Sequence, residues 1–154
     1  MFKKMRRKDR QLTDSETEDL LRTGVYGILS MVGLNGYGYG VPLSYAYTGG
    51  SIYCHCALEG QKLDNIRNNE KVSFCVVGEA VPLPEQFSMK YKSAIVFGRV
   101  HEVEGEEKLR ALIALVEKYS GEHLENGKEY AARSFDKTRA IRIDIEEITG
   151  KARK

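Results

Sequence analysis

Three consecutive residues of types that bind metal ions, Cys54, His55 and Cys56, lie in a segment of extended character. A structural zinc ion needs about four Cys or His ligands. In a strand, successive side chains point to opposite faces, so Cys54 and Cys56 share one face and His55 lies on the other. The remaining histidines, His101 and His123, lie in unrelated contexts. The spacing therefore argues against a metal site, and we interpret the two cysteines as small buried apolar side chains.

His55 and Lys62 flank a segment of strand–turn–helix character. Gly60 marks the turn, and a short helix begins after it, so free backbone N–H groups and the helix dipole favour an anion there. Lys62 adds a positive charge to the first turn. The pattern fits a phosphate site, and it fits equally well a lysine that is simply exposed to solvent. His55 titrates near neutrality. It could donate a proton, hold a small anion, or pack at the site and fix a backbone carbonyl.

Sequence periodicity indicates strands with helices between them. Thr13 and Glu16 fit a capping box, and the helix that they begin runs to Arg22, after which Gly24 suits a left-handed residue. Asn35-Gly36 predicts a hairpin turn. Strands are expected at residues 25–32, 37–47, 51–57, 71–77, 93–103 and 140–148, helices at 60–68, 105–119 and, for one or two turns, 128–135, and a loop at 78–90. Short turns join the first three strands, which are therefore antiparallel.

The longest expected helix carries one apolar stripe, made of Leu109, Leu112, Ile113 and Val116. Six strands with short helices between them indicate a mainly β fold. A chain of this size can close six antiparallel strands into a small barrel, which removes exposed strand edges. We therefore expect a six-stranded antiparallel barrel in a single domain.

Charge is unevenly distributed along the 154 residues. The first ten residues carry six Lys or Arg and one Asp, the last four carry three basic residues, and the rest holds 15 basic against 21 acidic residues. An acidic body lacks the basic face that nucleic-acid binding needs. We expect a basic arm at residues 1–12, either solvated or folded back onto an anion, ahead of one domain at residues 13–150.

The apolar segments are short. None approaches the roughly 20 residues that span a bilayer, and no apolar run follows the basic N-terminus as it would in a secretory signal. Three cysteines without a secretory context indicate reduced thiols. We expect a cytoplasmic protein that binds neither membranes nor nucleic acid.

The segment His55–Asp64 resembles the H-x-A-x-x-G-x-K-x-x segment of the nitroimidazole-resistance proteins, which belong to the pyridoxamine phosphate oxidase-like flavoproteins. Three further segments are similar to that family and occur in the same order. Met5–Arg10 resembles its basic N-terminal segment, Gly40–Tyr45 its second barrel strand, and Tyr91–Gly98 the strand before its long helix. Together the four segments extend over nearly the whole chain.

The resemblance implies a split β-barrel of the FMN-binding type, which forms a homodimer with two equivalent cofactor clefts between subunits. It implies that Lys62 holds the FMN phosphate, and that a histidine at the position of His55 lies beside the flavin and is the first choice for a catalytic side chain. It places the remaining cofactor contacts, partly through backbone groups, at Val41, Pro42, Leu43, Ser44, His55, Cys56 and Ala57, with Ser93 contributed by the same or the other subunit. No metal ligand is implied.

One feature departs from the pyridoxamine phosphate oxidases themselves. Those enzymes complete their substrate site with a C-terminal segment that contains Trp and Arg, whereas this chain has no Trp and its C-terminal part reads Glu146–Lys151. The resemblance thus favours an FMN-dependent reductase of a small oxidised compound, such as a nitroaromatic, over synthesis of pyridoxal phosphate. The alternative is a protein of the same fold that binds flavin without turnover or handles haem.

Overall fold

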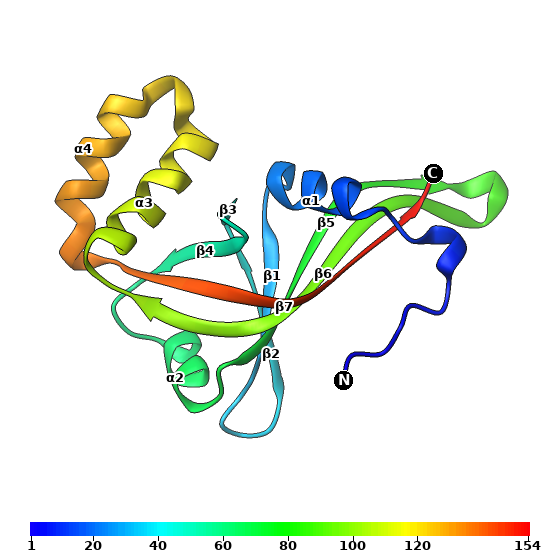
Figure 1. The fold of residues 1–154 in the computed structure, drawn as a ribbon, viewed down its shortest axis with the longest axis horizontal. Helices are drawn as coiled ribbons and strands as arrows, with labels where there is room; N and C mark the ends of the chain where they lie inside the picture. Colours follow the sequence, from blue (N-terminus) through cyan, green and yellow to red (C-terminus); the bar gives the residue numbers. More distant parts are fainter.

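A computed structural model describes the whole chain, Met1–Lys154. Seven strands form one sheet. They are β1 (Gly27–Val32), β2 (Gly38–Leu43), β3 (Ala46–Thr48), β4 (Ser51–Cys56), β5 (Lys71–Leu83), β6 (Ser88–Val103) and β7 (Arg139–Arg153). The α-helices are α1 (Asp14–Thr23), α2 (Gln61–Asn68), α3 (Gly105–Ser120) and α4 (Leu124–Ser134), and short 3-10 turns lie at Lys8–Arg10, Pro84–Gln86, Gly121–His123 and Phe135–Lys137. The long strands β6 and β7 cross the middle of the molecule, with α3 and α4 beyond one end and the β5–β6 hairpin at the other (Figure 1).

The strands follow the order β2-β1-β5-β6-β7-β4-β3, and all neighbouring strands are antiparallel. Strands β2 and β3 lie at opposite ends of this order, yet only Ser44 and Tyr45 separate them along the chain. Three Cα–Cα steps reach at most about 11 Å. The two end strands are therefore close in space, and the sheet curls into a barrel that stays open along the seam between β2 and β3.

The barrel has seven strands rather than six, because the strand expected at residues 37–47 is broken at Tyr45. The Tyr45 side chain is fully buried, meets the ring of Phe74 edge-on at 5.0 Å and donates its hydroxyl hydrogen to the carbonyl of Leu21. Its backbone N–H and C=O both lie 3.1 Å from the hydroxyl of Tyr119. The Tyr119 side chain of α3 thus meets the backbone groups of Tyr45 that a neighbouring strand would otherwise pair with. The expectation that the first three strands are antiparallel is confirmed, since β2 pairs with β1 and β3 pairs with β4, but the break places these two pairs at opposite ends of the strand order.

The loop expected at residues 78–90 is wrong as well. Strands β5 and β6 continue through this segment as a hairpin, with a register shift between Val77 and Ala80 and a tip at Pro84–Gln86 followed by Phe87 at φ 50°. Most side chains of the hairpin are exposed on both faces. The sequence of this hairpin shows no clear alternation of apolar and polar residues, because the hairpin extends beyond the core.

The N-terminal expectations are partly confirmed. Thr13 and Glu16 form the capping box, with the N–H of Glu16 3.2 Å from the Thr13 Oγ1 and the N–H of Thr13 2.9 Å from a Glu16 carboxylate oxygen. Gly24 is not left-handed, since its φ is −57°. A Cβ at Gly24 would lie 2.4 Å from the Cγ1 of Val76, so the position needs glycine for close packing.

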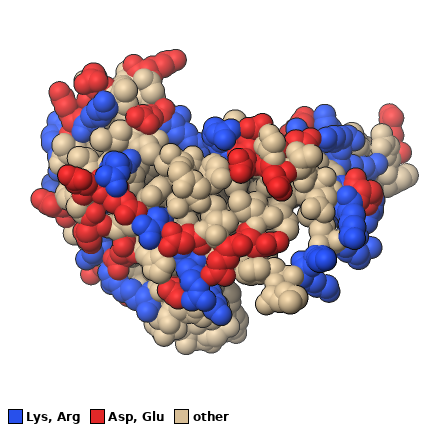
Figure 2. All heavy atoms as spheres, viewed as in Figure 1, with Lys and Arg blue, Asp and Glu red and all other residues tan.

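The residues before α1 fold back onto the sheet. The ring of Phe2 stacks on Phe97 of β6 at 5.2 Å, and the N–H of Leu12 donates to the carbonyl of Gly150 at 2.9 Å. The arm thereby adds its basic residues to the end of the molecule that holds the C-terminus. Figure 2 shows many Lys and Arg side chains at that end.

The core fills the inside of the barrel, and α1 and α2 contribute to it. Helix α3 packs against the outside of the barrel through Lys108, Ala111, Leu112 and Leu115, which are its buried residues. The stripe expected from the sequence is therefore only partly right, because Leu112 is buried while Leu109 is 37% exposed. None of the helices has the length and apolar character needed to cross a membrane.

Candidate functional site

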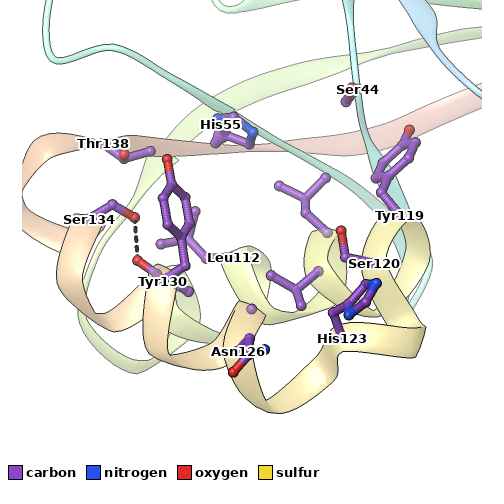
Figure 3. A pocket seen from close by; sticks show the side chains of 14 residues that line it. Ser44, His55, Leu112, Tyr119, Ser120, His123, Asn126, Tyr130, Ser134 and Thr138 are labelled. Atoms are coloured by element: carbon purple, nitrogen blue, oxygen red, sulfur yellow. Dashed lines mark hydrogen bonds between the residues drawn. The ribbon is translucent and has the colours of Figure 1, made fainter.

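A groove lies between the barrel and the hairpin of α3 and α4 (Figure 3). Its volume is ≈ 490 Å³, within the range of small-molecule sites. The barrel side contributes Ser44 from the β2–β3 link and His55 from β4. The remaining lining residues are Leu112, Leu115, Val116, Tyr119, Ser120, His123, Asn126, Gly127, Tyr130, Ala131, Ser134 and Thr138. No carboxylate, lysine or arginine is among them.

The pleat of β4 places His55 at this groove. Cys54 is fully buried in the core, whereas His55 on the opposite face is exposed, so the alternation expected from the sequence is confirmed. Burial raises the pKa of the Cys54 thiol to about 12 and also raises that of Cys56. Both thiols are protonated near neutrality and are poor nucleophiles. No three His, Cys, Asp or Glu side chains come together as metal ligands.

The imidazole of His55 is neutral near pH 7. Partial desolvation of the ring by the protein around it, although the residue is exposed, and then the positive charge of Lys62 lower its pKa below the usual 6.5. The ring forms no hydrogen bond with the protein, so it does not fix a backbone carbonyl. In Figure 3 it lies over the groove opposite Tyr130. His55 is thus free to exchange a hydrogen bond or a proton with whatever occupies the groove.

Lys62 is the second residue of α2, after Gly60, which caps the helix at φ 144°. Its side chain is partly buried, and its charge also lowers the pKa values of Cys54 and Cys56 against the larger effect of burial. The nearby cations Arg67 and Arg139 both pair with Glu102. Lys62 forms no ion pair. It is therefore the cation of this corner that remains available to an anion.

Arg139 is a residue of this corner that sequence reasoning missed. Its Nε donates a hydrogen bond of 2.8 Å to the carbonyl of Leu58, which holds the turn between β4 and α2. The residue opposes Cys56 at the start of β7. No local pattern marks it, because β7 comes more than 80 residues after β4.

Of the expected segment 41–44, only Ser44 reaches the groove. Val41 and Leu43 point toward the barrel core and pack against it, while Pro42 is exposed on the outer face. Neither Val41 nor Leu43 lines the groove. Likewise, Cys56 packs against the core, and Ala57 is exposed just after β4.

Ser93 lies far from the other expected site residues within one chain. It pairs with Lys151 of β7, whereas Cys56 pairs with Arg139, so 12 residues of β7 separate the two positions. At about 3.3 Å per residue this is roughly 40 Å along the strand. Ser93 instead lines a hollow of ≈ 190 Å³ beneath the N-terminal arm. Only a second subunit could bring it to the groove.

The helical wall of the groove was not expected from the sequence. Helix α4 begins at Leu124, ahead of the helical turn expected at 128–135. It packs closely on α3 because Gly127 faces Val116, whose Cγ1 would lie 2.2 Å from a Cβ at that position. This contact brings the side chains of His123, Asn126 and Tyr130 to the groove. Gly127, just before the helical turn expected at 128–135, was the only signal of this wall in the sequence.

The lining defines what the groove can do. Two imidazoles, two phenol rings and several hydroxyl groups offer stacking, hydrogen bonding and proton exchange. With the thiols protonated, the lining offers no strong nucleophile. These groups suit a flat ligand whose polar edge is oriented by hydrogen bonds.

Comparisons with known proteins extend this description. A family model described as pyridoxamine 5'-phosphate oxidase matches residues 13–152. The uncharacterized protein RA0666 of Rhizobium meliloti (strain 1021) is 37% identical over 65 residues, or 42% of this chain. The match spans 38% of that relative's length.

Two solved structures have the same fold. A candidate 5-nitroimidazole antibiotic resistance protein from Bacteroides thetaiotaomicron VPI-5482 has a TM-score of 0.76 at 20% identity, over 92% of this chain and 85% of that one. The FAD and haem binding protein of Mycobacterium smegmatis has a TM-score of 0.80 at 17% identity, over 93% and 73%. At these identities they show a shared fold alone. Since the family model covers nearly all of the barrel and its helices, this chain belongs to the pyridoxamine 5'-phosphate oxidase family and has its split-barrel fold.

Proposed function

We propose that the protein is an FMN-binding oxidoreductase that reduces a small oxidised compound, such as a nitroaromatic, as the nitroimidazole-resistance resemblance implies. The observation that carries this function is Lys62. A partly buried lysine without a carboxylate partner, at the first turn of α2 and near enough to the groove residue His55 to lower its pKa, fits the phosphate of a flavin nucleotide. Bound FMN would supply the electron transfer that no side chain of the groove provides.

The residues present fit such a cofactor. Lys62 would hold the phosphate, while Ser44 and the backbone of residues 55–57 would meet the polar edge of the ring. His55, neutral and without a protein partner, would lie beside the ring and exchange a proton with the substrate. Tyr119 and Tyr130 would bound the ring on the helical side. The 154 residues contain no Trp, a residue that the pyridoxamine phosphate oxidases use at their substrate site, which favours reduction over pyridoxal phosphate synthesis.

A second copy of the chain would complete the site. Ser93 can meet the groove only from another subunit, as the roughly 40 Å along β7 requires. The outer face of β5 and β6 around it exposes Val77, Ile95 and Phe97 by 48%, 40% and 38%. Apolar exposure of this kind is typical of an interface between copies. We expect sedimentation to show a homodimer. A monomer at micromolar concentration that still binds flavin would contradict a site shared between two subunits.

The test of the proposed function compares FMN with riboflavin, which lacks the phosphate. A charge-assisted phosphate contact contributes roughly 1.5–3 kcal/mol, so Lys62→Ala should weaken FMN by about one to two decades and riboflavin little. Lys71→Ala is the matched control, because Lys71 is an exposed lysine just after α2 without an ion pair. Equal losses for the two ligands would show that Lys62 does not meet the phosphate.

A second candidate function follows from the mycobacterial structure. One protein of the same fold binds FAD and haem. The alternative function is therefore that of a flavin or haem carrier without turnover. The absorbance spectrum of the purified protein separates flavin from haem. Steady consumption of a reduced nicotinamide with a nitro compound separates an enzyme from a carrier.

A further inference from the structure

Helix α3 inserts a lysine into the wall behind the groove. The Nζ of Lys118 is buried and has no hydrogen-bond partner. It lies 3.6 Å from the centre of the Tyr45 ring and 5.1 Å from that of Tyr119. No carboxylate pairs with it. An ammonium in this position lacks both water and a counter-ion.

The helical spacing of α3 explains why Lys118 is directed toward the barrel. Lys118 comes three residues after Leu115, so it continues the stripe of α3 that faces the barrel. Its amine is pushed toward the neutral form, because burial lowers the Lys118 pKa to about 8, while Cys54 acts weakly in the opposite direction. The cation–π contact with Tyr45 offsets only part of the free energy that is lost when an ammonium leaves water. The fold keeps an uncompensated positive charge here.

The residues that surround this charge belong to the groove lining or adjoin it in the chain. Tyr119 lines the groove directly, Tyr45 follows the lining residue Ser44, and Cys54 precedes His55. Since the lining contains no carboxylate, nothing in it neutralises the field of Lys118. Negative charge on a ligand beside Tyr119, whose ring centre lies 5.1 Å from the Lys118 Nζ, is therefore stabilised.

We propose that Lys118 is the electrostatic partner of the reduced flavin ring, and this role rests on the flavin site proposed above. The oxidised ring is neutral, whereas two-electron reduction with uptake of one proton leaves it negatively charged. A buried cation behind the groove favours the second form over the first. Lys118 is thus a positioning charge that raises the reduction potential, while Lys62 acts on the phosphate in both oxidation states.

The experiment measures the midpoint potential of bound FMN and of bound riboflavin. Lys118→Met should reduce the ratio of reduced to oxidised affinity about tenfold for both ligands, which equals a fall of about 30 mV for a two-electron couple. Lys118→Arg should keep the potential, because it keeps the charge. Lys62→Ala should instead weaken FMN more than riboflavin, because only FMN carries the phosphate, whereas Lys118→Met should shift both potentials alike.

Lys108→Met is the matched control. Lys108 is also buried on α3 and lies 4.1 Å from the centre of an aromatic ring, that of Phe135. It lies ten residues earlier, about 15 Å along the helix. Its loss should leave the potential nearly unchanged. Equal shifts for Lys108→Met and Lys118→Met would overturn the specific role of Lys118.

A second readout uses the unaltered protein and needs no variant to fold. The pKa of the Lys118 amine, followed by NMR of labelled lysine, should rise when reduced flavin binds and stay low with oxidised flavin. An unchanged pKa together with unchanged potentials would overturn the role of Lys118 and leave the flavin site standing. Failure of the unaltered protein to bind any flavin would overturn the proposed function, and the role of Lys118 with it.

Discussion

Tyr119→Phe removes the hydroxyl through which α3 contacts the backbone of Val25 and the backbone of Tyr45. The Tyr119 hydroxyl lies 2.6 Å from the carbonyl of Val25, and 3.1 Å from both the N–H and the C=O of Tyr45. It accepts from the N–H and, having one hydrogen, donates to one carbonyl at a time. The Val25 side chain is 72% exposed, whereas Tyr45 is fully buried. Water can replace the bond at Val25 more readily than the one at Tyr45.

The cost therefore arises mainly at Tyr45. A buried N–H left without a partner costs about 1–3 kcal/mol, so we expect Tyr119→Phe to lower the free energy of unfolding by about 2 kcal/mol. For a chain of this size that equals a fall in Tm of about 4–8 °C. Urea unfolding followed by circular dichroism measures the change.

Tyr130→Phe is the control for this substitution. Tyr130 belongs to the same helical hairpin and lines the same groove, but it is 65% exposed and its hydroxyl has no protein partner. Its loss should change stability by less than about 0.5 kcal/mol. Similar losses for the two variants would refute the idea that Tyr119 supports the break between β2 and β3.

Two further predictions concern a tight backbone contact and the groove histidine. Gly98→Ala would place a Cβ 2.3 Å from the backbone oxygen of Asp144, which cannot rotate away. It should therefore lower the free energy of unfolding in urea by about 3 kcal/mol. Gly38→Ala is the control, because no atom lies within 4 Å of the added Cβ, and it should leave the free energy of unfolding almost unchanged. If protonated His55 donates a proton to the substrate, reoxidation of the reduced flavin should slow as pH rises through its lowered pKa, below 6.5. His55→Gln should remove this pH step in stopped-flow traces, while His123→Gln, at the other groove imidazole, should keep it; a step that survives His55→Gln would exclude His55 as the donor.

Local signals in the sequence predicted local structure well. The capping box of Thr13 and Glu16, the turn at Gly36 and the alternation of Cys54 with His55 each depend on residues within a few positions of one another. The resemblance added the split barrel and the pyridoxamine phosphate oxidase family. These features were confirmed because short-range chemistry or a whole-chain match fixes them.

The remaining features depend on distant residues. The strand break at Tyr45 is stabilised by Tyr119, 74 residues later, and no local residue announces it. The helical wall of the groove exists because Gly127 packs on Val116 and places α4 opposite β4. Lys118 looks like an ordinary surface lysine in the sequence, since only the rotation of α3 against the barrel buries it.

The place of β7 in the sheet has a consequence for how the chain folds as it is synthesised. Strand β7 is the last to leave the ribosome, yet it lies between β6 and β4. Until residues 139–153 emerge, the β3–β4 hairpin has no strand to join and the sheet consists of two unconnected pieces. The earlier strands must wait with exposed edges, which invites chaperone binding. Emergence of β7, rather than growth of the preceding part of the chain, should therefore set the moment at which the barrel and its groove form.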